Sequence, residues 1–137
     1  MSNILELAGR RALVTGATKG VGRAVAARLR DAGASVLGTA RARPADLSAE
    51  KLFVTADVAT AEGCAAVADA VMKQFGGIDI VVHVVGGSSA PAGGFAVLDD
   101  REWQRALDLN LFPAVISSRP SVWIARSCQR CWSRAPG

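Results

Sequence analysis

Hydrophobic residues in the first 110 positions fall into two alternating kinds of segment. Short apolar runs, which are typical of buried strands, lie at residues 11–15, 35–40, 52–56 and 78–85. Between and after them, apolar residues recur at the spacing of an amphipathic helix at residues 21–32 and 60–75, and a third long helix is expected after Asp99-Asp100, with Trp103, Ala106, Leu107 and Asn110 on related faces. This order predicts one α/β domain, because strands that alternate with helices pair in parallel through right-handed crossovers.

The ends of these segments carry their own signals. Gly33 and the pair Gly76-Gly77 follow the first two predicted helices, where glycine commonly ends a helix. Asp99 and Asp100 precede the third, where a carboxylate can accept hydrogen bonds from the first turn. The run at 78–85 is almost continuously apolar, which predicts a strand covered on both faces.

The composition is that of a packed globular protein. The chain has 137 residues, which suits one domain, and half of them are hydrophobic while 20% are charged, which argues against disorder. No stretch of about 18 apolar residues occurs, so we expect no membrane-spanning helix. The first residues lack the basic start and apolar run of a signal peptide, and the three cysteines suit a reducing compartment. We therefore expect a cytoplasmic protein.

The net charge of +4 is unevenly distributed along the chain. Positive and negative residues balance over residues 1–110, and the whole excess comes from four arginines in residues 111–137, a stretch without any acidic residue. A basic balance of this origin gives no support to nucleic-acid binding.

A glycine-rich stretch joins the first predicted strand to the first predicted helix. It reads Thr15-Gly16-Ala17-Thr18-Lys19-Gly20-Val21-Gly22. Glycines in this position let the backbone turn tightly and approach a pyrophosphate, whose negative charge the helix N-terminus favours. The alternative is a structural turn without a ligand. The strand-to-helix context favours a dinucleotide site.

From about residue 8 to residue 112, the chain resembles the N-terminal half of a short-chain dehydrogenase/reductase, a family of NAD(P)-dependent oxidoreductases with a Rossmann-type fold. The glycine stretch matches the family's cofactor motif, and Asp57-Val58 after the third predicted strand matches its adenine-binding pair. Asn110 matches the asparagine of the family's catalytic tetrad, and Gly86 would approach the nicotinamide ribose. The resemblance implies a three-layer α/β fold with a parallel sheet, of which the first four strands and their helices are present.

One motif departs from the family pattern after the fourth predicted strand. The family usually has Asn-Asn-Ala-Gly there, whereas this chain has His83-Val84-Val85-Gly86-Gly87. The glycine pair keeps the close approach to the cofactor, but the bracing asparagine is replaced. We interpret His83, the only histidine, as a strand-end residue bonded to neighbouring backbone, with a catalytic base as the alternative.

The charges near the glycine stretch favour NADP over NAD. An NAD site needs a carboxylate at the end of the second strand for the ribose hydroxyls, and residues 39–43 contain none. Lys19 and Arg41 could together hold the 2′-phosphate of NADP, since arginine offers a fork of donors that suits phosphate. The alternative is that both are solvated surface cations. The resemblance agrees with NADP, because family members that prefer NADP carry basic residues at these places.

The chain lacks the family's proton donor. Family members use a serine and a Tyr-x-x-x-Lys pair beyond the fifth strand, but this sequence contains no tyrosine and no lysine after Lys73. Loss of general acid catalysis typically costs about 10²–10⁴-fold in rate, so we expect this polypeptide alone to be nearly inert. We interpret the chain as a fragment of an oxidoreductase acting on a carbonyl or alcohol substrate. The alternatives are a non-catalytic nucleotide-binding module and a non-functional truncation product.

Residues 113–137 do not continue the pattern. They contain two of the three tryptophans and a Cys128-x-x-Cys131 pair, but no further ligands nearby, so we expect no metal site. Back-translated and shifted by one base, the end of this segment can read as an amphipathic helix, which suggests a frameshift. We therefore expect a basic tail foreign to the family after residue 112. The helix before it, around 103–111, is a subunit contact in the family, which implies a homo-oligomer.

Overall fold

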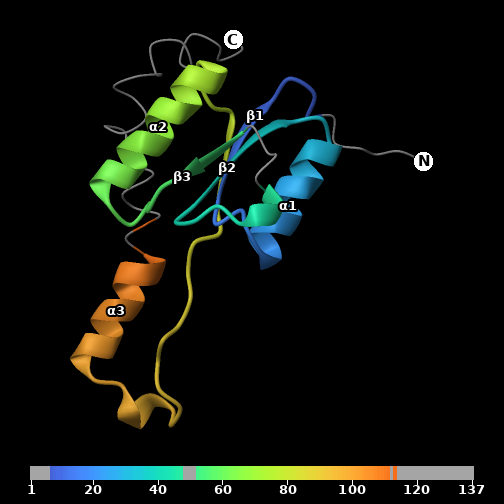
Figure 1. Ribbon diagram of the computed structural model, residues 1–137. Coiled ribbons are helices and arrows are strands. Elements are labelled where there is room, and N and C mark those ends of the chain that lie inside the picture. Colours follow the sequence, from blue (N-terminus) through green and yellow to red (C-terminus); the bar gives the residue numbers. More distant parts are fainter. Residues whose placement is uncertain (1–6, 48–51, 112, 114–137) are drawn as a thin grey trace, which may run out of the picture.

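The computed structural model describes residues 7–47, 52–111 and 113 and contains an open parallel sheet with helices on both sides (Figure 1). Its elements follow the predicted order. They are β1 (Arg11–Thr15), α1 (Gly20–Asp31), β2 (Ser35–Ala40), η1 (Ala45–Leu47), β3 (Phe53–Thr55), α2 (Ala61–Phe75), β4 (Ile80–His83), η2 (Phe95–Val97) and α3 (Asp100–Asn110). The predicted tail falls at residues 113–137, of which all but Pro113 lie outside the described residues.

The strands lie in the order β3-β2-β1-β4, and every neighbouring pair is parallel. Crossing from β3 back to β4 on the far side of β1 produces a switch in direction at β1. In sheets of this kind, ligands bind in the crevice beyond the carboxyl ends of the strands at such a point. The predicted α/β fold is therefore confirmed. Its topology predicts a ligand site beyond the carboxyl ends of the strands, next to β1.

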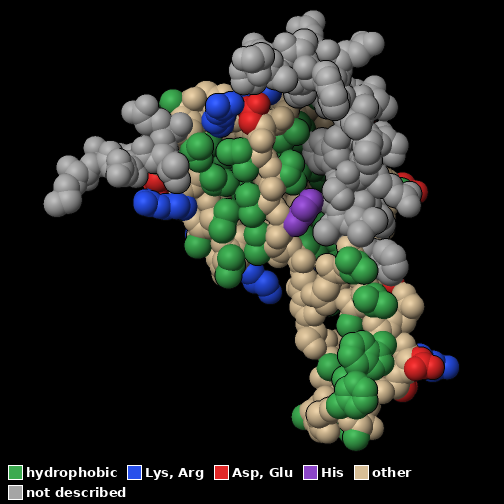
Figure 2. All heavy atoms as spheres, turned by 180° about the vertical axis from the view of Figure 1, so that it is seen from behind, with side chains coloured by type: hydrophobic (Ala, Val, Ile, Leu, Met, Phe, Trp, Pro, Cys, Tyr) green, Lys and Arg blue, Asp and Glu red, His purple; other side chains and the backbone are tan. Residues whose placement is uncertain are grey.

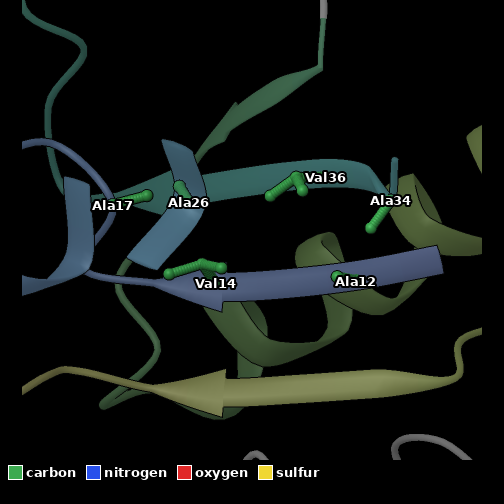
Figure 3. Close-up of a cluster of buried hydrophobic side chains, with 6 residues drawn as sticks. All are labelled: Ala12, Val14, Ala17, Ala26, Ala34 and Val36. Carbon is green, nitrogen blue, oxygen red and sulfur yellow. The ribbon is translucent and has the colours of Figure 1, made fainter. Parts of the chain in front are cut away.

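Alternate residues of β1 face two different layers. Ala12 and Val14 face α1, and Leu13 between them faces α2, as the period of two in a strand requires. The α1 side is a cluster of small side chains, which lets the helix lie close to the sheet (Figure 3). Its buried members are Ala12, Val14, Ala17, Ala26, Ala34 and Val36.

The sequence was misleading for β4. The prediction of a strand covered on both faces is wrong, because β4 alternates between half-buried and exposed residues, and Val81 is 40% exposed. Ile80 and Val82 pack on the α1 side, but β4 is an edge strand among the described elements. An apolar run shows that a segment favours burial. It does not tell which element covers that segment.

Gly76 and Asp99, two of the predicted helix-end signals, stand where expected, and Thr60 adds a cap that was not predicted. The Thr60 hydroxyl accepts a hydrogen bond from the Gly63 amide at 3.0 Å, and α2 ends at Gly76 in the left-handed conformation. The Asp99 carboxylate accepts one from the Glu102 amide at 2.9 Å and begins α3. None of the described helices is long and apolar enough to cross a membrane.

Arg11 and Asp79 clamp the end of the sheet that lies away from the carboxyl ends of the strands. Arg11 Nε and Nη2 donate to the two carboxylate oxygens of Asp79, each at 2.8 Å, and the Arg11 amide donates to Asp79 as well. The side-chain hydrogen bond from Arg11 is the main cause that lowers the pKa of Asp79 from 3.8 to about 2. This clamp joins the start of β1 to the turn before β4.

We predict that Asp79→Asn lowers the free energy of unfolding by about 1 kcal/mol at pH 7, since the pair is partly exposed and screened by water. The folded pKa is depressed, so the stabilisation exists above the ordinary pKa of 3.8 and disappears as the pH falls towards about 2. Urea unfolding at pH 7 and pH 3 measures this, with Asp31→Asn as the control. An equal loss at both pH values would contradict the assignment.

Candidate cofactor site

The glycine stretch brings the chain into unusually close contact with itself. Gly16 and Gly20 have φ values of +71° and +51°, a region that favours glycine. A Cβ on Gly22 would lie 2.1 Å from the carbonyl oxygen of Gly16, so only glycine allows α1 to pass over this turn. β2 holds this glycine turn in place, because the Gly16 amide donates to the Thr39 carbonyl oxygen at 2.8 Å.

A cleft of about 670 Å³ lies at the carboxyl ends of the strands, within the size range of small-molecule sites. Ten of the residues predicted to bind cofactor line it, namely Gly16, Thr18, Lys19, Gly20, Val21, Gly22, Arg41, Asp57, Val58 and Gly86. The prediction missed a second group, which consists of Thr39, Ala40, Ala42, Ala56, Ala59, Val84, Val85, Leu109 and Pro113. Most of these residues lie at or shortly after the carboxyl ends of strands. Because the strands of a parallel sheet all end at the same edge, the topology alone could have identified them.

Two predicted site residues, Thr15 and Asn110, do not line the cleft, and their side chains instead make hydrogen bonds to backbone that leads into it. Thr15 is fully buried, and its hydroxyl accepts a hydrogen bond from the Val84 amide at 3.2 Å. The same hydroxyl lies 3.3 Å from Nδ1 of His83. Thr15 thus fixes the point where the chain leaves β4, rather than presenting a group to a ligand.

Asn110 is the other predicted residue behind the cleft. Its Oδ1 accepts a hydrogen bond from the Gly87 amide, and its Nδ2 donates to the carbonyl oxygens of Gly87 and Ala106, all at 2.9 Å. The amide therefore ties the end of α3 to the glycine pair after β4. A Cβ on Gly86 would lie 2.7 Å from Asn110 Oδ1, so this contact requires glycine at 86.

The turn after β3 is fixed by its own hydrogen bonds. The Asp57 carboxylate accepts one from the Ala59 amide at 3.0 Å, and its carbonyl oxygen accepts one from the Thr60 hydroxyl at 2.9 Å. Below it, the buried Cys64 thiol donates to the Val58 carbonyl oxygen at 3.2 Å. Burial, and then the charge of Asp57, raise the pKa of Cys64, so this thiol is a packing group of low reactivity.

His83 lies at the end of β4, as expected. Burial lowers the pKa of its imidazole, and its Nδ1 meets the Thr15 hydroxyl. This contact is with a side chain, and the bond to neighbouring backbone that the sequence predicts for His83 stays a prediction. Among the described residues, no group of three or more His, Cys, Asp or Glu side chains could hold a metal ion.

The positive charges around the cleft divide into two kinds. Arg23 forms an ion pair with Asp46 at 2.6 Å, and Arg43 lies over the Phe53 ring, 5.0 Å from its centroid. By contrast, Lys19 and Arg41 line the cleft, and their side chains have no hydrogen-bond or ion-pair partner within the described part of the chain. The site therefore offers two uncommitted cations beside a helix N-terminus whose first turn contains no acidic residue.

The sequence matches the short chain dehydrogenase family over residues 10–122. The chain belongs to this family. Among curated members, the 3-oxoacyl-(acyl-carrier-protein) reductase of Vibrio cholerae is 32% identical over 113 residues, which cover 78% of this chain and 46% of that protein. The 3beta-hydroxysteroid dehydrogenase 1 of Eggerthella lenta is 35% identical over 127 residues, or 85% and 48% of the two proteins.

Solved structures of similar fold also match the chain. The ligand-free aldohexose dehydrogenase of Thermoplasma acidophilum matches with a TM-score of 0.73 and 28% identity, over 90% of this chain and 46% of that one. An NADH-dependent reductase complexed with NAD matches with the same score and identity, over 90% and 54%. The chain thus spans about half the length of the curated relatives it matches.

We predict that Gly22→Ala lowers the free energy of unfolding by about 3 kcal/mol or more, because the added methyl group meets backbone that cannot move aside. Thermal unfolding of the chain measures the loss. Gly20→Ala is the matched control, since it has open space around its Cβ and should cost only about 1 kcal/mol of left-handed strain. Similar losses in both variants would show that the close approach is unimportant.

Proposed function

We propose that this chain forms the cofactor-binding part of an NADP-dependent oxidoreductase, which transfers hydride between the nicotinamide ring and a carbonyl or alcohol substrate. The observation that carries the proposal is the cleft itself, in which a glycine turn, a helix N-terminus and two uncommitted cations meet. The family of the chain supports the oxidoreductase class. When bound, the cofactor would supply the hydride, and the residues of this chain would hold and orient it.

The assignment of NADP depends on charge. A ribose 2′-phosphate adds negative charge beside the end of β2, where residues 40–43 offer arginine and alanine and no carboxylate. Arg41 and Lys19 have no other partner to leave within the described chain, so binding phosphate would cost them no existing ion pair. By contrast, the NADH-dependent reductase of similar structure is complexed with NAD, the unphosphorylated cofactor.

Fixed backbone would orient the two ends of the dinucleotide. The Asp57–Val58 turn, braced by the Thr60 hydroxyl and the Cys64 thiol, would hold the adenine. Gly86, held against Asn110, would allow close approach of the nicotinamide ribose. We propose Asn110 as the one member of the family's catalytic tetrad in this chain, and residues 1–112 as the dinucleotide-binding half-domain.

The proton step would need groups from outside these 137 residues. The sequence contains no tyrosine, so it has no counterpart of the family's proton donor. The proposal for this polypeptide by itself is therefore binding of NADP with little or no turnover. A non-catalytic nucleotide-binding module predicts the same binding, and a non-functional product predicts none.

We predict that Lys19→Ala and Arg41→Ala each weaken NADP binding about tenfold, because each removes a charged donor to the 2′-phosphate, and leave NAD binding nearly unchanged. Isothermal titration with both nucleotides measures this. Arg43→Ala is the matched control, since Arg43 packs on Phe53 and does not line the cleft. Parallel losses for NADP and NAD would show that neither cation reads the phosphate.

The outer face of α3 supports a second element of the proposal, contact with another copy of the chain. Figure 2 shows hydrophobic side chains gathered on the part of the molecule that projects from the sheet. No residue of α3 is buried, although Trp103, Leu107 and Leu111 recur on one side of it and are each more than 40% exposed. Phe95 of η2 packs edge-on against Trp103 and extends the patch.

We predict that the chain sediments as a dimer and that Trp103→Glu shifts it towards monomer, because a charge cannot be buried in an apolar contact. Analytical ultracentrifugation at several protein concentrations measures the change. Arg101→Glu, which places the same charge elsewhere on α3, should leave the dimer intact. A monomeric parent chain would contradict this part of the proposal.

A further inference from the structure

Thr39, near the end of β2, has a hydroxyl that makes no hydrogen bond in the free chain. The residue lines the cleft and yet exposes none of its surface. Its Oγ1 is the one buried side-chain polar atom of the described residues that has no hydrogen-bond partner. Burying a hydroxyl without a partner disfavours the folded state, and such groups in native proteins call for an explanation.

Thr15 provides the comparison. It is the direct partner of Thr39 across the β1–β2 ladder, and it is equally buried. Its hydroxyl, however, accepts a hydrogen bond from the Val84 amide at 3.2 Å and meets His83. Of these two ladder partners, only Thr15 has a hydroxyl that is satisfied by the protein.

The backbone of Thr39 does not explain its hydroxyl. Its carbonyl oxygen accepts hydrogen bonds from the amides of Gly16 at 2.8 Å and Ala17 at 3.2 Å, and so anchors the glycine turn. Valine would provide the same carbonyl and the same branched shape. Anchoring the glycine turn and filling this position therefore need a β-branched residue but no hydroxyl. The hydroxyl remains available for a hydrogen bond to a bound ligand.

The position of Thr39 in the cleft indicates which part of a dinucleotide it would serve. Arg41 comes two residues after Thr39, just beyond the end of β2, and Asp57 and Val58 come after the end of the adjacent strand β3. Gly86 lies beyond β4, on the opposite side of β1. If Arg41 binds the 2′-phosphate, then Thr39 lies at the adenosine half of the site.

We propose that the Thr39 hydroxyl donates a hydrogen bond to the adenosine half of the bound dinucleotide, and that it finds its partner only in that complex. The inference rests on the proposed function, since it concerns the same cleft. Because Thr39 exposes no surface, binding must be accompanied by a small movement at the floor of the cleft, such as a rotation of this side chain about χ1. The unpaired hydroxyl lowers the stability of the free chain and is retained for the ligand.

The test compares Thr39→Val, which keeps the shape and removes the hydroxyl, with Thr39→Ser, which keeps the hydroxyl. Binding of NADP, adenosine 2′,5′-bisphosphate and nicotinamide mononucleotide is measured by titration for each. Thr39→Val should weaken the first two ligands about fivefold, the effect of one lost hydrogen bond, and leave the third unchanged. Thr39→Ser should bind the first two as the parent chain does.

Thermal unfolding without ligand separates this role from a structural one. Thr39→Val should raise the Tm by about 2 °C or more, because it removes an unpaired buried hydroxyl. Thr15→Val, the matched control, should lower it, because that hydroxyl has partners. A lower Tm for Thr39→Val would identify a structural hydroxyl and overturn the proposal.

Unchanged affinity of Thr39→Val for adenosine 2′,5′-bisphosphate would also overturn the inference, while leaving the NADP site in place. If the parent chain binds neither NADP nor the bisphosphate, then the proposed function itself fails. The two failures are thus distinguished by the parent chain.

Discussion

The contact between Gly22 and Gly16 is the constraint on which the rest of the structure depends. It lets α1 begin directly above the turn that leaves β1, so the helix N-terminus faces the carboxyl ends of the strands. The small side chains of the α1-facing core serve the same end, since they keep the helix close to the sheet along its length. The hydrogen bonds from Gly16 and Ala17 to Thr39 then pass this constraint to β2, and so to the position of Arg41.

Much of the fold and most of the site could be predicted from the sequence. The strands and helices were recognisable because their apolar spacing differs, and the glycine stretch marked one strand-to-helix junction at which a ligand could approach backbone. The sequence could not show that Thr15 lies behind the cleft while Thr39, its partner in the ladder, lines it. That difference depends on the order of the strands and on the paths of the neighbouring loops. The spacing of apolar residues along the chain predicts neither. The exposure of Val81 has the same origin.

The positive charge that the site offers a ligand depends on which cations already have a partner, as well as on how many cations lie nearby. Arg23, Arg41 and Arg43 are close in sequence or in space to the end of β2, and composition alone treats them alike. The structure commits Arg23 to Asp46 and places Arg43 over Phe53, which leaves Arg41 with Lys19 for a ligand. Selectivity for a phosphate would thus come from which cations remain unpaired in the cleft.

A dinucleotide is proposed to bind in this cleft, with a preference for the form that carries the 2′-phosphate. The most direct measurement is titration of the 137-residue chain with NADP and with NAD at the same ionic strength, low and then raised. NADP should bind at least about tenfold more tightly than NAD, and this advantage should shrink as salt screens the phosphate contacts. Equal affinities, or tighter binding of NAD, would contradict the proposal.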